Sequence, residues 1–243
     1  MPSTPFTLRV APDYETMSAW AAATILQRVR GNPCLLGLAT GSTPTRTYEL
    51  LGNVARREPQ LFQELRVLKL DEWGGLEMDD PATCETYLRR LVLGPLAISN
   101  DRYFAWESNP PDSAAECMRM ATWLAREGPI DLCVLGLGVN GHLAFNEPAD
   151  ALQPGPHVAQ LSANSLSHAM LTRARRPPSF GLTLGIADLL RSRSILLLVS
   201  GSHKADPLRR LLEPRVTPHF PASFLWLHPD VTIFTDLREM VGD

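Results

Sequence analysis

Short apolar runs alternate with longer amphipathic stretches along the chain. Near-continuous apolar runs predict six strands, at residues 6–10, 34–39, 66–69, 132–137, 194–199 and 231–234. Apolar residues at helical spacing predict four helices, at residues 13–31, 44–57, 113–126 and 204–212. Strands that are apolar on both faces and alternate with helices are typical of a covered parallel sheet. The pattern therefore predicts an α/β fold with a doubly wound, mainly parallel, Rossmann-like sheet.

The length of 243 residues suits one domain with a full core. The composition, 44% hydrophobic and 20% charged, is that of an ordinary globular protein, with neither a membrane-spanning run nor a signal-peptide pattern. A net charge of −3 does not indicate a nucleic-acid partner. With this net charge, a small anionic substrate would need a local positive site. We therefore expect a globular domain over residues 1–243 that engages neither nucleic acid nor membrane.

The four cysteines form no CxxC pair, and no spacing resembles a zinc site. Cys34 and Cys133 lie within apolar runs, which favours buried thiols in a reducing compartment. We expect a cytoplasmic protein that binds no metal.

The stretch 149–180 has few apolar runs and is rich in Pro, Ser, Arg and His. It predicts an excursion from the sheet, a small helical lid over the site. Sites on doubly wound sheets lie beyond the carboxyl ends of the strands. That rule points to three loops, at residues 40–44, 71–76 and 138–148.

The first loop, Thr40-Gly41-Ser42-Thr43-Pro44, lies between a predicted strand and a predicted helix. Gly41 lets the backbone approach a ligand, and free N–H groups with three hydroxyls would form a cradle for an anion. The alternative is a helix start capped by Ser42 or Thr43. The loop is not a Walker loop, because it lacks a GKS or GKT ending.

The second loop begins with the acidic pair Asp71 and Glu72, directly after a predicted strand. A carboxylate near an apolar floor can have its pKa raised to a value useful for proton transfer. The alternative is a solvated turn or a helix cap.

The third loop reads GLGVNGHLAFNEP over residues 136–148 and contains Gly138, His142 and Glu147. Its glycines indicate tight backbone geometry near a ligand, and a histidine with a nearby carboxylate suits proton shuttling. The GxGxxG spacing is not a dinucleotide fingerprint, because the acidic residue about 20 positions on is missing. Lys204, after another predicted strand, could place a charge on a phosphate or simply face solvent.

Taken together, the segments TGSTP, DEW, GLGVNGHLAFNEP and GSHKA resemble, in this order, the glucosamine-6-phosphate deaminase/isomerase family. The resemblance covers nearly the whole chain and continues in PASFLWLHP at residues 221–229. The segments LATGSTP, KLDEW, TCETYL and IDLCVLGLGVNGHLAFNEP are most similar to the galactosamine-6-phosphate isomerase branch.

The resemblance implies roles for individual residues. Asp71 would move a proton between C2 and C1 of the opened sugar, and His142, assisted by Glu147, would open the ring. The products would be a ketose 6-phosphate and ammonia, with no metal or organic cofactor. The expected ligands of the sugar phosphate are Thr40, Gly41, Ser42, Thr43, Glu72, Gly138 and Lys204.

Three features depart from the family pattern. Asn140 stands where an aspartate is usual, so an amide oxygen would accept from the imidazole without adding a charge. The position of the family's phosphate-binding lid arginine falls near Leu171, and Arg173, Arg175 and Arg176 are the nearby candidates. Residues 150–161 do not match the allosteric site of hexameric members, so we expect no activation by an N-acetylated sugar phosphate.

The leading hypothesis is isomerisation and deamination of a hexosamine 6-phosphate, with galactosamine 6-phosphate preferred over glucosamine 6-phosphate. The alternatives are a sugar-phosphate lactonase of the same fold and a sugar-phosphate sensor without turnover. The sequence leaves open which C4 epimer is used and whether the chain forms a homo-oligomer.

Overall fold

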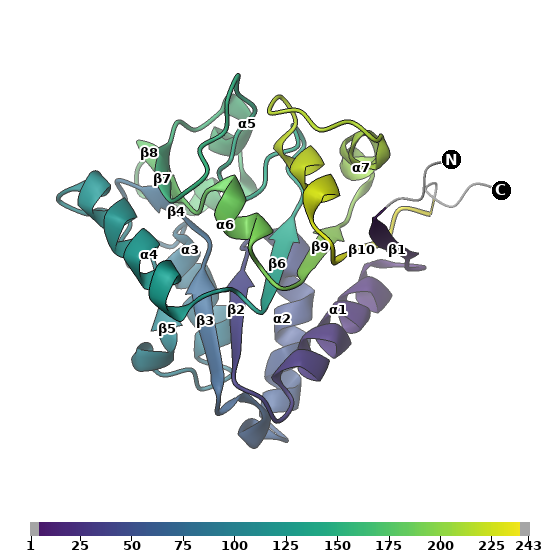
Figure 1. Ribbon diagram of the computed structural model, residues 1–243. Helices are drawn as coiled ribbons and strands as arrows, with labels where there is room; N and C mark the ends of the chain where they lie inside the picture. The colour runs from purple at the N-terminus through teal and green to yellow at the C-terminus, as the bar shows by residue number, and fades with distance from the viewer. Residues whose placement is uncertain (1–4, 239–243) are drawn as a thin grey trace.

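A computed structural model describes residues 5–238. Its main sheet has seven strands in the order β1-β10-β9-β6-β2-β3-β5, and every neighbouring pair is parallel (Figure 1). The strands are β1 (Phe6–Val10), β2 (Cys34–Leu38), β3 (Leu65–Lys69), β5 (Tyr103–Phe104), β6 (Leu132–Gly136), β9 (Ile195–Val199) and β10 (Val231–Thr235). All six predicted strands are present, and the predicted mainly parallel α/β fold is confirmed.

Helices cover both faces of this sheet (Figure 1). The longer ones are α1 (Tyr14–Val29), α2 (Ser42–Ala55), α4 (Ser113–Glu127) and α7 (Ala205–Leu212), close to the four predicted ranges. Shorter helices are α3 (Cys84–Leu88), α5 (Ala163–Leu166) and α6 (Ile186–Leu190), and a 3-10 helix spans Pro221–Leu227. Helices on both faces complete the doubly wound arrangement.

Alternate residues of the strands feed two separate cores. On β6, Cys133 and Leu135 pack into the core that α4, α6 and α7 cover, whereas Leu132 and Val134 pack into the core beneath α1 and α2. This period of two, with both faces apolar, explains why the strands read as continuous hydrophobic runs.

A second, smaller sheet has three antiparallel strands in the order β4-β8-β7. They are β4 (Asp71–Gly74), β8 (Phe180–Thr183) and β7 (His157–Ala159). The prediction of a loop at residues 71–76 was wrong over β4, because the polar letters of DEWG concealed a strand whose four residues are all buried. Only Leu70 separates β3 of the large sheet from β4 of the small one.

The segment 149–180 contains β7, α5 and a 3-10 helix at Ala169–Arg173. It is therefore not purely helical, and its strand joins it to β8. Its movement as a lid stays a prediction. Across residues 5–238, no helix combines the length and the apolarity needed to cross a membrane.

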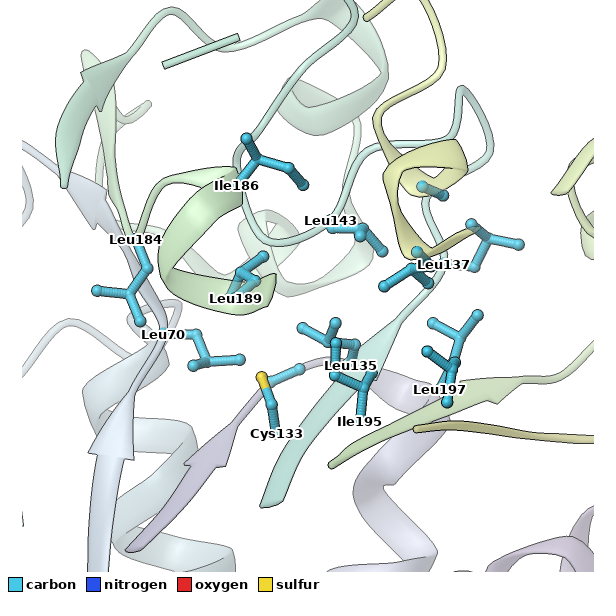
Figure 2. Packing of buried hydrophobic residues seen from close by; sticks show 14 of the residues in the cluster. Leu70, Cys133, Leu135, Leu137, Leu143, Leu184, Ile186, Leu189, Ile195 and Leu197 are labelled. Atoms are coloured by element: carbon cyan, nitrogen blue, oxygen red, sulfur yellow. The ribbon is translucent and has the colours of Figure 1, made fainter. Parts of the chain in front are cut away.

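The apolar core continues upward to the loops at the ends of the strands. Figure 2 shows Leu137 and Leu143 above the end of β6, with Leu70 and Leu184 grouped at the start of the small sheet. Leu143 and Leu184 are fully buried. Burying side chains of this size stabilises the fold by roughly 1.5–3 kcal/mol each. The glycine-rich loop is thus packed on the hydrophobic core through its leucine side chains.

Candidate active site

A cavity of about 430 Å³ lies at the carboxyl ends of β2, β6 and β9. The three predicted segments around Thr40–Thr43, Asp71 and Gly138–His142 line it together, and Lys204 also lines it. Residues of the segment 149–180, among them Ser165 and His168, close another side. The cavity therefore lies where the carboxyl-end rule for doubly wound sheets places a site.

The loop between β2 and α2 presents the start of a helix to the cavity. Gly41 is the N-cap of α2 with a φ of 103°, a conformation that L side chains rarely adopt, and no side chain caps the helix. The alternative of capping by Ser42 or Thr43 is therefore wrong, since Ser42 is the first helical residue. The hydroxyls of Thr45 and Tyr87 both donate to the Gly41 carbonyl at 2.8 Å and fix the loop. A helix N-terminus held in this way attracts an anion.

Asp71 is the first residue of β4 and only 8% exposed. Burial, with the negative charge of Glu72, raises the pKa of Asp71 to about 7, while Lys69 offsets part of the rise. The Cys84 thiol lies 3.9 Å from Asp71 Oδ1 and 3.2 Å from the Thr40 hydroxyl. It therefore links the carboxylate to the loop at residues 40–44, called the anion loop below. A carboxyl group with this pKa can accept and return a proton near neutral pH.

Glu72, predicted to bind substrate, points away from the cavity and is fully buried. Its carboxylate accepts from Lys69 Nζ at 2.6 Å and from the backbone N–H groups of Trp73, Cys84 and Glu85 at 2.8, 2.8 and 2.9 Å. Because the carboxylate already accepts from four donors, it is not free to bind a ligand. We therefore correct its role from ligand to support of the strand that carries Asp71.

Lys69 is as deeply buried as Glu72 and also contacts Glu85 Oε2 at 2.9 Å. Glu85 accepts in addition from the Tyr103 hydroxyl at 2.7 Å and pairs with Arg89 at 2.7 Å. One buried ammonium between two carboxylates compensates charges that would otherwise be costly to desolvate. This network lies directly beneath the residue predicted to be the base.

His142 and Glu147 come together at the glycine-rich loop, as predicted. Nδ1 of His142 lies 3.6 Å from Glu147 Oε2, and both side chains are mostly buried, with exposures of 22% and 11%. Burial alone would raise the pKa of Glu147, but the interactions with His142, the Ser165 hydroxyl and the Asn140 amide lower it to about 2. Glu147 is therefore an anion at neutral pH, and it faces an imidazole on the wall of the cavity.

Asn140 does not contact the imidazole in the way the sequence suggested. Its Nδ2 donates to Glu147 Oε2 at 2.8 Å, and its Oδ1 accepts from the backbone N–H of His142 at 3.1 Å. The expectation that its amide oxygen accepts from the ring was wrong, because the side chain braces the loop and orients the carboxylate instead.

Glycine is required where the backbone touches the ring. A Cβ on Gly138 would lie 2.5 Å from Cγ and Cδ2 of His142. The absence of a side chain at Gly138 therefore lets the imidazole lie against the backbone. Gly138 also lines the cavity.

Lys204 lies at the cavity as predicted and donates to the Leu137 carbonyl at 2.6 Å. Burial lowers the pKa of Lys204. The three candidate arginines do not line the cavity. Arg175 pairs with Asp79 at 2.8 Å and Arg176 with Glu77 at 3.4 Å, both on the exposed surface.

Sequence reasoning missed several residues of the cavity wall. Trp73, Ser165 and His168 line the cavity, brought there by tertiary packing from β4 and the segment 149–180, and Cys84 of α3 contacts Asp71 from behind the wall. The only signal was the abundance of Ser and His in that segment. Over residues 5–238, no three His, Cys, Asp or Glu side chains are arranged to hold a metal ion. The metal-free site stays a prediction.

Comparisons with known proteins find similarity over almost the whole chain. Residues 13–233 match the family described as glucosamine-6-phosphate isomerases/6-phosphogluconolactonase. The chain is 42% identical to AgaI of Escherichia coli strain K12, a provisionally named deaminase, over 91% of this chain and 88% of AgaI. It is 37% identical to a glucosamine-6-phosphate deaminase of Bacillus pumilus, over 92% and 94% of the two chains.

Solved structures give the same picture. A monomeric glucosamine-6-phosphate deaminase superposes with a TM-score of 0.91 at 35% identity, covering 96% of this chain and 98% of that one. The 6-phosphogluconolactonase of Trypanosoma brucei, at 21% identity and a TM-score of 0.77 over 99% and 100% of the chains, shares the fold.

Proposed function

The chain belongs to the glucosamine-6-phosphate isomerases/6-phosphogluconolactonase family, and we propose that it converts a hexosamine 6-phosphate to a ketose 6-phosphate and ammonia. One observation carries the proposal. A buried carboxyl group with a pKa of about 7 and a histidine–glutamate pair share a cavity with the N-terminus of α2. The first two can move protons, and the third is suited to the phosphate of the substrate.

The reaction divides between the two proton-transfer groups. His142, held against Glu147, takes the proton of the C1 hydroxyl and returns it to the ring oxygen as the ring opens. Asp71 then removes the proton from C2 and delivers it to C1, while one proton passes from the C2 nitrogen to the C1 oxygen, which leaves an imine at C2 and a hydroxyl group at C1. Addition of one water to that imine releases ammonia and leaves the ketone. Proton transfers of this kind need no electron acceptor.

Within this reaction, we propose galactosamine 6-phosphate as the preferred substrate and glucosamine 6-phosphate as the alternative. The support is the resemblance of KLDEW, TCETYL and the segment before the glycine-rich loop to the galactosamine branch. The four free cysteines are consistent with the proposed cytoplasmic location.

The test is ammonia release measured side by side on both hexosamine 6-phosphates, together with hydrolysis of 6-phosphogluconolactone. We expect ammonia from at least one sugar, faster from galactosamine 6-phosphate. Asp71→Asn is the control for chemistry, because the amide preserves the volume of a buried side chain while removing its basicity. If the chain hydrolyses the lactone and releases no ammonia, the proposed function is wrong and the chain is a lactonase. Sugar-phosphate binding without turnover of any substrate would indicate a sensor.

A further inference from the structure

The cavity holds few cations with which to bind a phosphate. Among residues 5–238, its lining includes no arginine, and its basic side chains are His142, His168, His203 and Lys204. His142 faces Glu147 and is assigned to ring opening. The remaining cationic groups therefore decide how a dianionic phosphate is held.

The tautomer of His168 is set by its backbone surroundings. His168 is the N-cap of the 3-10 helix at Ala169–Arg173, and its Nδ1 accepts from the backbone N–H of Met170 at 3.3 Å. An imidazole nitrogen that accepts is unprotonated, so the proton of the neutral ring lies on Nε2. His168 thus presents an N–H donor in both of its charge states.

That donor points at the anion loop. Nε2 of His168 lies 3.5 Å from the position that a Cβ on Gly41 would occupy. Gly41 is the N-cap of α2, so the ring stands beside the helix terminus that attracts an anion. The indole of Trp73 also lies near the ring, with the centroids 6.0 Å apart. The side chain is half-buried and held in place before any ligand arrives.

We infer that His168 is the phosphate ligand supplied by the segment 149–180, in place of an arginine, and that it takes up a proton when the phosphate binds. The inference rests on the proposed sugar-phosphate function. It assigns the recognition of the 6-phosphate jointly to the Nε2–H group of His168, the loop around Gly41 and the ammonium of Lys204. It also makes this recognition dependent on pH, which a site built with arginine would not be.

The charges around His168 give the sign of that dependence. Burial, with the positive charges of His142 and Lys204, lowers the pKa of His168 in the free protein. His203 also lines the cavity. On the side formed by β4, Asp71 contributes a carboxylate to the cavity wall. A bound dianion would reverse the net field at the ring and raise the pKa of His168. Proton uptake therefore accompanies binding, and affinity falls as pH rises through the pKa values of the free and bound states.

The direct test is an NMR titration of the histidine Cε1–H resonances of the full chain, with and without inorganic sulfate. Sulfate keeps a fixed charge of −2, so any proton uptake belongs to the protein. The His168 resonance is assigned by its loss in His168→Gln. We expect its midpoint to lie below the usual range for a histidine and to rise when sulfate is added. A His168 midpoint that sulfate does not move overturns the inference.

Steady-state kinetics separates a ligand from a merely structural residue. We expect His168→Ala to raise KM for the hexosamine 6-phosphate about 10- to 100-fold, the range for a lost charge-assisted hydrogen bond, with a smaller change in kcat. His168→Gln restores a donor without a charge, so it should recover part of the affinity and flatten the dependence of KM on pH. His219→Gln is the matched control, since His219 is exposed and lies outside the cavity.

The two levels of the argument fail separately. Ammonia release with an unchanged KM in His168→Ala would overturn the role of His168 and leave the proposed function standing. A chain that releases no ammonia, yet shows a His168 midpoint raised by sulfate, would retain the anion site and lose the proposed reaction.

Discussion

Gly138 lies so close to the ring of His142 that a single added methyl group tests the placement of the imidazole. In Gly138→Ala, the new Cβ would be 2.5 Å from Cγ and Cδ2 of the ring. Carbon atoms in contact prefer about 3.5 Å, so the ring must retreat by roughly 1 Å. A misplacement of about 1 Å can lower a rate by about 10²-fold, which is about 2.7 kcal/mol of activation free energy.

The assay is ammonia release under saturating substrate, accompanied by thermal unfolding. We expect kcat to fall by about two orders of magnitude, with a small change in KM because Lys204 and the anion loop stay in place. Gly155→Ala is the matched control, because its Cβ meets nothing within 4 Å and Gly155 lies outside the cavity. A Gly138→Ala enzyme that folds normally and keeps kcat within about threefold would refute the assignment of the ring position to catalysis.

Two further variants test the charges near the reacting groups. Glu72→Gln removes the negative charge that helps raise the pKa of Asp71 and leaves Lys69 less compensated, so that pKa should fall. Wild-type kcat/KM should decline as pH drops through about 7, where Asp71 becomes protonated. In Glu72→Gln this decline should occur at lower pH. A decline at the same pH as in the wild type would contradict the assignment to Asp71. The same variant should unfold at lower temperature, because disrupting a buried ion pair costs up to roughly 3–5 kcal/mol. Asn140→Asp replaces a donor to Glu147 by a second carboxylate, which should raise the pKa of Glu147 from about 2; an NMR titration of the Glu147 carboxyl group would detect the rise, and an unchanged midpoint would contradict it.

The sequence predicted the large sheet well, because strands buried on both faces need continuous apolar runs. β6 is an example, since LCVL divides its side chains between two cores and leaves little room for ambiguity. The short strands were not predictable in this way. β5 has two residues and β7 has three, too few for a periodic pattern.

The candidate site was predicted where chemistry is local and missed where it depends on packing. His142 and Glu147 lie five positions apart on one loop, so their encounter followed from the sequence. The burial of Glu72 depends on Lys69 and on backbone N–H groups of Cys84 and Glu85, more than ten residues away. Such a carboxylate reads as a surface residue until its partners are placed around it.

The passage from β3 to β4 couples the chemistry to the cover of the site. Lys69 ends a strand of the large sheet, whereas Asp71 begins a strand that is hydrogen-bonded to β8, and β8 in turn pairs with β7 of the segment 149–180. Leu70 between them is fully buried, and Lys69 and Glu72 pair at 2.6 Å across it, so the small sheet is tied to the large one at the point where Asp71 begins. A substitution that displaces β8 should therefore disturb both Asp71 and the segment that carries His168, and so impair proton transfer and phosphate binding together.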